Sequence, residues 1–301
     1  METLIQDLGI YKKNHLFMKR EDLIPFSFGG NKARKAILFF EDFDKGEYDC
    51  VVTYGSSSSN HCRIVANICA LRGIICYIIS PEEASGKTAN SKMLELFKAE
   101  ITIVPIIEVT STIDKKLLEL KIEGKKPYFI PGGGHGNIGT QAFIDCYKEI
   151  LNNDVQFDYI FFASGTGTTH AGLIAGKLLN AGQENIIGIS VARNNPYGRQ
   201  VVIDSITEYF SHGEFSYEHI SKETVFLDDY IGDGYAKRDN AVEETVKEIL
   251  LKYGIPMDST YTGKAFCGMK KYIISNKIEG KNILFIHTGG TPLFFDTLKF
   301  L

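Results

Sequence analysis

A lysine that directly follows a glycine turn is the first candidate for chemistry in this sequence. Phe28-Gly29-Gly30-Asn31 leads into Lys32, and Arg34 and Lys35 follow it at once. A lysine that attacks a carbonyl group must be deprotonated, and burial or neighbouring cations lower its pKa. Arg34 and Lys35 supply such cations, so the run predicts a covalent cofactor site at Lys32. Taken alone, the run also fits the solvated basic face of a helix.

A turn of small residues, Ser164-Gly165-Thr166-Gly167-Thr168-Thr169, follows an apolar strand and precedes a helix. Such a turn presents backbone N–H groups and hydroxyls at a helix N-terminus, an arrangement that binds phosphate. Tight packing of the turn is the alternative interpretation. The turn contains neither Gly-Lys-Ser/Thr nor Gly-x-Gly-x-x-Gly, which argues against a nucleotide-binding α/β protein.

A run of four serines, Ser56 to Ser59, precedes Asn60 and His61 at the start of a helical pattern. This loop can lay hydroxyl and N–H groups over a substrate carboxylate and place an amide beside a cofactor oxygen. A flexible loop that ends in a helix N-cap is the alternative. The last strand ends in His287-Thr288-Gly289-Gly290, and Tyr235 and Tyr261 lie upstream as two candidate phenols.

Short β-branched runs must position these turns, because they alternate with segments whose apolar residues have helical spacing. We expect strands at 50–54, 74–79, 100–104, 128–130, 159–162, 186–191 and 283–286, and helices at 60–71, 138–153 and 169–180. This pattern predicts an α/β fold with ligands at the carboxyl ends of parallel strands. The two groups of strands predict a smaller domain at 48–146 and a larger one at 1–47 plus 147–301.

The composition favours a protein that acts on small molecules. A net charge of -4 gives no basic surface for nucleic acid or anionic lipid. No apolar run reaches the roughly 18 residues that span a bilayer, and the N-terminus lacks a secretory signal, so a cytoplasmic protein is expected. The six cysteines form no Cys-x-x-Cys pair and the histidines lack ligand spacing, so we expect reduced thiols and no metal site.

Together, these motifs resemble those of the 1-aminocyclopropane-1-carboxylate deaminase and D-cysteine desulfhydrase family, from Lys19 to about Phe295. The resemblance implies pyridoxal 5'-phosphate as cofactor and a homodimer. It also implies the tryptophan synthase β-like fold, or fold type II. That fold has two open, twisted, mostly parallel sheets flanked by helices, with the cofactor between a larger cofactor-binding lobe and a smaller substrate-closing lobe.

The resemblance also assigns roles to individual residues. Lys32 would hold the cofactor as a Schiff base, Asn60 would bond to its ring oxygen and Thr288 would face its ring nitrogen. The phosphate would be held by Lys35, Gly165, Thr166, Gly167, Thr168 and Thr169. The catalytic groups would be Lys32, Ser59, Tyr261 and Tyr235. The substrate would meet Ser58, Ser59, Asn60, His61 and His135, although an ordinary loop histidine is the alternative for His135.

Two positions separate the branches of this family. The deaminases carry a glutamate after the second tyrosine and a leucine in the His-x-Gly-Gly turn, whereas desulfhydrase-like members carry threonine at both, as here at Thr262 and Thr288. A carboxylate keeps the pyridine nitrogen protonated, whereas a hydroxyl leaves it largely neutral, which suits β-elimination. We therefore expect a lyase that removes the Cα proton of a small amino acid, with D-cysteine as the leading substrate and pyruvate, ammonia and sulfide as products.

Several alternatives stay open. The same site would support β-replacement, and opening of a cyclopropane ring is the other chemistry in the family. A non-catalytic protein that binds an amino acid or pyridoxal phosphate is the alternative from another class, and the intact Lys32 argues against it. Ser56 and Ser58 replace a glycine and a glutamine of the family loop, and His135 stands where a serine is usual. These departures leave the amino acid, its stereochemistry and its leaving group undetermined.

Overall fold

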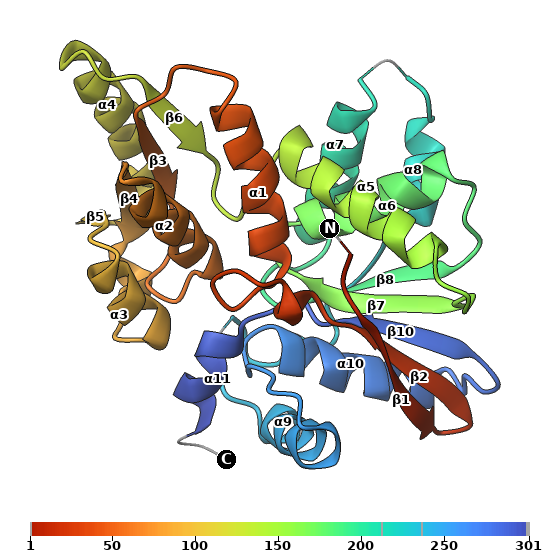
Figure 1. Cartoon of the computed structure of the whole chain (residues 1–301). Helices are drawn as coiled ribbons and strands as arrows, with labels where there is room; N and C mark the ends of the chain where they lie inside the picture. The colour runs from red at the N-terminus through yellow and green to blue at the C-terminus, as the bar shows by residue number, and fades with distance from the viewer. Residues whose placement is uncertain (1, 212, 236, 299–301) are drawn as a thin grey trace. The chain divides into compact units, whose positions relative to one another are not determined.

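The structure is a computed structural model that describes residues 2–211, 213–235 and 237–298 (Figure 1). Its strands are β1 (Ile5–Tyr11), β2 (Asn14–Lys19), β3 (Cys50–Tyr54), β4 (Ile75–Pro81), β5 (Glu100–Val104), β6 (Pro127–Ile130), β7 (Tyr159–Ser164), β8 (Asn185–Ser190), β9 (Val225–Leu227) and β10 (Asn282–Ile286). Its α-helices are α1 (Asn31–Phe43), α2 (Asn60–Arg72), α3 (Ala89–Leu96), α4 (Val109–Ile122), α5 (Asn137–Leu151), α6 (Thr168–Leu179), α7 (Tyr197–Tyr209), α8 (Tyr217–Glu223), α9 (Asn240–Tyr253), α10 (Thr262–Ser275) and α11 (Thr291–Thr297). The fold class is the α/β class that the sequence predicts.

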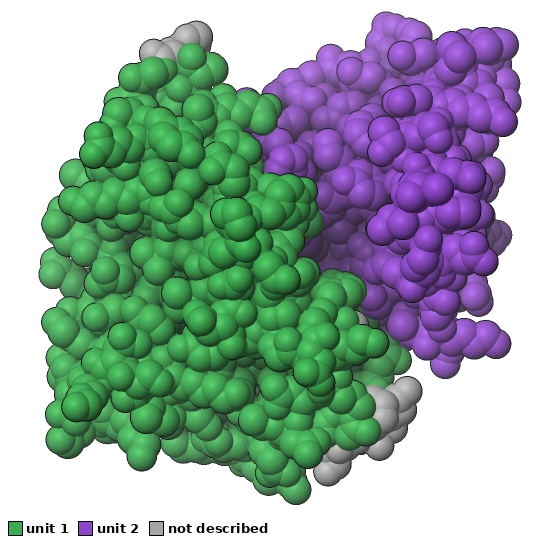
Figure 2. Space-filling view, turned by 180° about the vertical axis from the view of Figure 1, so that it is seen from behind, with its two compact units in different colours: residues 1–31, 139–301 green, residues 32–138 purple. Residues whose placement is uncertain are grey.

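The chain divides into two compact units, residues 1–31 with 139–301 and residues 32–138, coloured separately in Figure 2. The predicted boundaries lie at 47/48 and 146/147, whereas the two units divide at 31/32 and 138/139. The structure therefore groups α1, from Lys32 onward, with the sheet of residues 50–130. Aromatic packing accounts for this grouping: the rings of Phe43 and Tyr128 meet edge to face at 5.7 Å, and the Tyr128 hydroxyl donates to Asp42. The functional division into cofactor-binding and substrate-closing domains stays a prediction.

The first unit contains a mixed six-stranded sheet in the order β1-β2-β10-β7-β8-β9. β1 is antiparallel to β2, and the remaining neighbours are parallel. The register pairs Ile286 with both Lys19 and Phe162, and Ser164 with Ser190. The turns after β2, β10, β7 and β8 therefore leave the same edge of this sheet.

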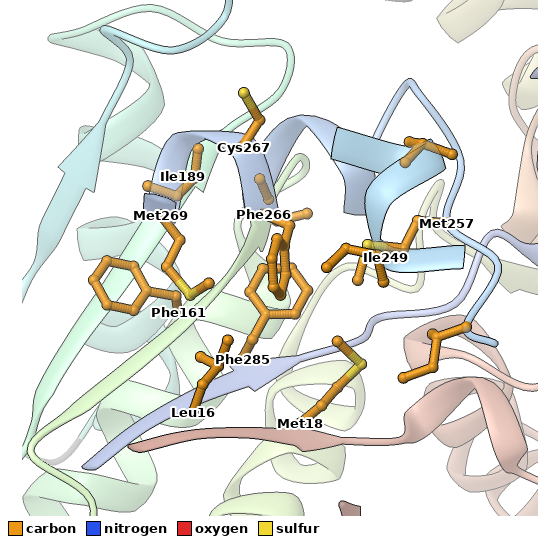
Figure 3. Close-up of a cluster of buried hydrophobic side chains, with 14 of the residues drawn as sticks. Leu16, Met18, Phe161, Ile189, Ile249, Met257, Phe266, Cys267, Met269 and Phe285 are labelled. Atoms are coloured by element: carbon orange, nitrogen blue, oxygen red, sulfur yellow. The ribbon is translucent and has the colours of Figure 1, made fainter. Parts of the chain in front are cut away.

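Helices cover both faces of this sheet, with α9 and α10 on one face and α5 and α6 on the other (Figure 1). The core under α9 and α10 is apolar and rich in aromatic residues (Figure 3). Phe266 of α10 packs edge to face on Phe285 of β10, with ring centroids 4.9 Å apart. Burial of such side chains contributes about 1.5–3 kcal/mol each and holds the strand ends in place.

The second unit contains a parallel four-stranded sheet in the order β5-β4-β3-β6. Its central strand β3 is almost wholly buried, as expected of a parallel strand covered on both faces. Small apolar clusters join β3, β4 and β6 to α4. All six cysteines of the chain are buried and none forms a disulfide.

All seven expected strands and all three expected helices are present, with ends shifted by no more than about two residues. Strands β1, β2 and β9 were not predicted from the sequence. The β1–β2 hairpin turns through Lys12 and Lys13, whose φ angles are 48° and 64°, without the glycine or asparagine that usually signals such a turn. β9 is only three residues long.

Candidate active site

Close backbone packing joins the turn before Lys32 to the turn after β10. The N–H of Asn31 donates to the carbonyl oxygen of Thr288 at 2.9 Å. A Cβ atom on Gly30 would lie 2.8 Å from that oxygen, and one on Gly289 would lie 2.5 Å from the Cα of Gly30. Glycine is thus required at both positions by space, and also by φ angles of 97° and 95°.

The turn after β7 forms the start of α6. Gly167 is the N-cap, with φ 96°, and as a glycine it has no side chain that could accept a hydrogen bond from the first N–H groups of the helix. The first N–H groups of a helix need partners from outside the helix, and the dipole favours an anion there. Two contacts hold the turn: Asn31 Nδ2 donates to Thr169 Oγ1 at 3.0 Å, and Arg193 Nη1 donates to the carbonyl oxygen of Thr166 at 2.8 Å.

The two candidate tyrosines meet in the first unit. The hydroxyls of Tyr235 and Tyr261 are hydrogen-bonded at 2.5 Å, and their rings are 5.9 Å apart. Buried Lys264 holds the loop that carries Tyr235, because its Nζ donates to the carbonyl oxygens of Ile231 and Gly234, each at 2.8 Å. The structure thus brings together two phenols that the sequence places 26 residues apart.

The hydroxyl and the N–H of Thr262 are both hydrogen-bonded to a buried carboxylate, that of Asp258. Asp258 Oδ1 accepts hydrogen bonds from the N–H groups of Thr260 and Tyr261. Its Oδ2 accepts from the N–H and the hydroxyl of Thr262, at 3.3 and 2.9 Å. Burial raises the pKa of Asp258, and these hydrogen bonds oppose that rise. Thr262 and Asp258 therefore build the start of α10, whereas the hydroxyl of Thr288 makes no hydrogen bond to any residue that the structure describes.

In the second unit, Lys32 and Lys35 lie beneath the glycine-rich turn after β6. Lys32 Nζ donates to the carbonyl oxygen of Gly133 at 3.1 Å. A Cβ on Gly134 would lie 3.2 Å from the Cδ of Lys35, which is 1% exposed. Arg34 is buried as well, so this run is not a solvated face.

Burial lowers the pKa of Lys32 to about 8. The sequence predicts that the cations at Arg34 and Lys35 lower this pKa, but in the structure the cause is desolvation of the Lys32 amine. For Lys35, burial first and then repulsion from Lys32 lower the pKa well below its usual value. A lysine with a pKa near 8 is partly neutral at neutral pH and can act as a nucleophile or a base.

His61 is held neutral in one tautomer. The Thr53 hydroxyl donates to the carbonyl oxygen of Ile130 at 2.7 Å, so it accepts from His61 Nε2 at 2.8 Å. Burial, followed by the charges of Lys32 and Lys35, lowers the pKa of His61 to about 3. His61 is thus an uncharged imidazole with its proton on Nε2. Any contact with substrate would use Nδ1 as an acceptor.

The serine loop is ordered by its own side chains and by α3. Ser59 is the N-cap of α2, and its Oγ accepts from the N–H of Cys62 at 3.1 Å, which leaves its own proton to donate. The hydroxyls of Ser56 and Ser58 lie 3.2 Å apart. Asn60 Oδ1 accepts from Asn90 Nδ2 at 2.9 Å. His135, which is half-buried, lies in the turn that covers Lys32.

The first unit therefore groups the glycine-rich turn at 165–169 with Asn31, and separately pairs Tyr235 with Tyr261. The second unit groups Lys32, Lys35 and His61, and places Ser58 to Asn60 on one loop. Four residues that hold these groups in place were not predicted from the sequence, namely Asn31, Asn90, Arg193 and Asp258. For Asp258 only a weak signal was present: an aspartate often accepts a hydrogen bond from the N–H two residues further on, as it does here from Thr260, but the N-cap position itself is held by Tyr261. Asn90 lies inside a helix and carries no such signal.

A comparison with protein families decides the identity of the chain. Residues 3–289 match the family described as "Pyridoxal-phosphate dependent enzyme". The chain belongs to this family. It is therefore a pyridoxal-phosphate-dependent enzyme. Its mixed six-stranded sheet and its parallel four-stranded sheet, each flanked by helices, match fold type II.

Solved structures agree with this assignment. A structure described as an ACC deaminase homologue is 28% identical, with a TM-score of 0.86 and coverage of 100% of this chain and 94% of that chain. A hydrogen sulfide-producing enzyme from Fusobacterium nucleatum is 18% identical, with a TM-score of 0.65 and coverage of 96% of each chain. Threonine deaminase isoform 2 from Solanum lycopersicum is 16% identical, with a TM-score of 0.66 and coverage of 99% and 86%. The last two show the fold alone.

The residues present fit pyridoxal phosphate. Lys32 has a lowered pKa, as attachment to an aldehyde requires. The helix start at Gly167 presents N–H groups suited to a phosphate. Within the described ranges, no group of histidine, cysteine, aspartate or glutamate side chains is arranged to hold a metal, and no helix is long and apolar enough to cross a membrane.

Proposed function

We propose that this enzyme is a lyase of D-cysteine, which it converts with water to pyruvate, ammonia and sulfide by loss of the Cα proton and β-elimination. The observation that carries the proposal is the difference between Thr288 and Asp258. Thr288 offers a hydroxyl without a partner in the described part of the chain, whereas the carboxylate of Asp258 is fully used by the start of α10. A hydroxyl makes one hydrogen bond to a pyridine nitrogen and cannot keep it protonated as a carboxylate does.

Bound pyridoxal phosphate withdraws electrons from the substrate Cα, so that a base of modest strength can remove the Cα proton. In our proposal Lys32 carries the cofactor and later acts as that base. Its pKa near 8 suits both roles at neutral pH, since a useful fraction of the amine is unprotonated. Lys35 and the turn from Gly165 to Thr169 hold the phosphate through charge and N–H groups.

The leaving group requires a proton donor. The paired hydroxyls of Tyr261 and Tyr235 provide one phenol that donates while the other accepts, so a proton lost by Tyr261 can be replaced from Tyr235. Ser59 has a hydroxyl proton to donate, because its oxygen already accepts from Cys62 N–H. Ser58 and Asn60 on the same loop bind the substrate carboxylate and the cofactor ring oxygen. Neutral His61 and half-buried His135 complete the proposed substrate contacts.

A panel of D- and L-amino acids tests the proposal. We expect D-cysteine to give pyruvate, ammonia and sulfide in equal amounts with the purified enzyme and none with Lys32→Ala. Release of 2-oxobutanoate from 1-aminocyclopropane-1-carboxylate, without activity on D-cysteine, would overturn elimination in favour of ring opening. Incorporation of an added thiol or other nucleophile instead of pyruvate release would establish β-replacement. Mass measurement in solution tests the expected homodimer.

A further inference from the structure

Asn90, in α3, is fully buried beside the serine loop. Its Nδ2 donates to the carbonyl oxygen of Ser58 at 2.8 Å and to Asn60 Oδ1 at 2.9 Å. A backbone carbonyl only accepts, so the amide nitrogen of Asn90 must be the group that faces Ser58. The same nitrogen then requires an oxygen from Asn60. The Asn60 amide is therefore oriented with its oxygen toward Asn90 and its Nδ2 directed elsewhere.

The amide oxygen of Asn90 supports this orientation of the Asn90 side chain, because it is left without a hydrogen bond so that the amide nitrogen can face Ser58 and Asn60. Asn90 Oδ1 is buried and accepts no hydrogen bond from the residues that the structure describes. An unmatched buried acceptor costs about 1–3 kcal/mol. A flipped amide would point Oδ1 at two other acceptor oxygens, which is worse. The chain thus keeps a donor at this position although the other half of the amide has no partner.

The backbone around Asn90 is fastened to the same loop. The Thr88 hydroxyl donates to the carbonyl oxygen of Ser57 at 2.9 Å, and Gly86 N–H donates to Ser57 Oγ at 2.8 Å. Thr88 and Ser91 form a capping box that starts α3. The position of the Asn90 amide is therefore determined on both sides, by helix α3 and by the loop it contacts.

We propose that Asn90 is a positioning residue that sets the orientation of the Asn60 amide, so that Asn60 presents its NH2 group as a donor to the ring oxygen of the cofactor. Asn90 acts only through Asn60 and does not touch the cofactor. The inference rests on the proposed role of Asn60. It predicts that the two residues affect cofactor binding as one unit.

A double-mutant cycle tests this. Asn60→Ala and Asn90→Ala should each raise the dissociation constant of pyridoxal phosphate about two- to tenfold, the effect of one hydrogen bond, and shift the pH midpoint of the visible absorbance band in the same direction. The double variant should bind pyridoxal phosphate no more weakly than Asn60→Ala alone, because Asn90 affects the cofactor only through Asn60. Asn90→Asp keeps the side-chain volume but lacks the NH2 group, so it should behave like Asn90→Ala.

Ser91→Ala is the matched control, since it weakens the capping box of the same helix without contact to Asn60. It should lower the unfolding temperature and leave the dissociation constant and the absorbance band unchanged. Additive effects of the two alanine variants, or wild-type behaviour of Asn90→Asp, would overturn the role of Asn90. If Asn60→Ala changes neither the dissociation constant nor the absorbance band, then the assigned contact of Asn60 with the cofactor is wrong. If Asn60→Ala changes both and Asn90→Ala changes neither, then Asn60 keeps its role and only the role of Asn90 is wrong.

Discussion

The N–H of Asn31 donates a hydrogen bond to the carbonyl oxygen of Thr288 at 2.9 Å. This bond ties the residue before Lys32 to the turn after the last strand, 257 positions away along the chain. Because Gly30 and Gly289 pack backbone against backbone beside it, this connection has little freedom to shift. The position of Asn31 within the first unit is thus closely determined.

The attachment of the cofactor provides the first prediction. Borohydride reduction of the holoenzyme, followed by peptide mass spectrometry, should place the pyridoxyl group on Lys32, and Lys32→Ala should lose both the label and the yellow colour. Lys264→Met is the control, because Lys264 is also buried with a lowered pKa and yet is held by two carbonyl oxygens. A label on any other lysine would refute the assignment.

The lowered pKa of Lys32 also predicts a pH-dependent stability of the cofactor-free protein. Its folded-state pKa is about 8 and its usual value is 10.5, so the unfolded chain binds the proton more tightly. Stability should therefore rise between pH 8 and 10.5, and the full cost of burying the charge is present below pH 8. Lys32→Met should increase the free energy of unfolding by about 1–3 kcal/mol at pH 7.

That gain should shrink toward zero near pH 10.5, as measured by urea unfolding at both pH values. Lys45→Met is the control, since Lys45 is exposed and should change stability little at either pH. A destabilised Lys32→Met at pH 7 would show that Lys32 is not charged against a desolvation cost.

The phenol pair predicts a loss of turnover without loss of cofactor. Tyr261→Phe should lower kcat by about 10² to 10⁴, the range for a lost proton-transfer group, with an unchanged dissociation constant for pyridoxal phosphate. Tyr235→Phe should lower kcat less, since Tyr261 keeps its own hydroxyl. Tyr272→Phe, in the same helix α10, is the control and should leave kcat unchanged. Normal turnover of Tyr261→Phe would make it a packing residue.

The two threonines predict opposite phenotypes. Thr288→Val should weaken cofactor binding by about two- to tenfold and alter the absorbance spectrum, because one hydrogen bond is lost, with little change in stability. Thr262→Val should instead lower the free energy of unfolding by about 1.5–3 kcal/mol, because buried Asp258 loses a hydroxyl partner. Spectral titration and urea unfolding of both variants separate the roles. The reverse pattern would assign the ring nitrogen to Thr262.

The sequence by itself determined the α/β class, the seven strands it predicted and the family. These depend on local signals, since β-branched runs, helical spacing and glycine turns act over a few residues. The proposed cofactor lysine Lys32 and the proposed phosphate-binding turn at 165–169 could be predicted for the same reason, since each is marked by a short glycine-rich motif. The hairpin through Lys12 and Lys13 was not, because its turn lacks the usual glycine or asparagine.

Only the tertiary structure decided which partner each polar group takes. Both Thr262 and Thr288 follow the family pattern for a threonine near the cofactor ring. The hydroxyl of Thr262 donates to Asp258, whereas the hydroxyl of Thr288 has no partner in the described part of the chain. Lys32 and Lys35 belong to a basic run that could equally lie in solvent, but Lys35 is buried under the turn after β6 and half-buried Lys32 donates to the carbonyl oxygen of Gly133 in the same turn. Asn90 orients Asn60 across 30 residues of sequence. Such pairings depend on the distance and burial that folding creates, and a buried polar group must find its partner there or remain unsatisfied.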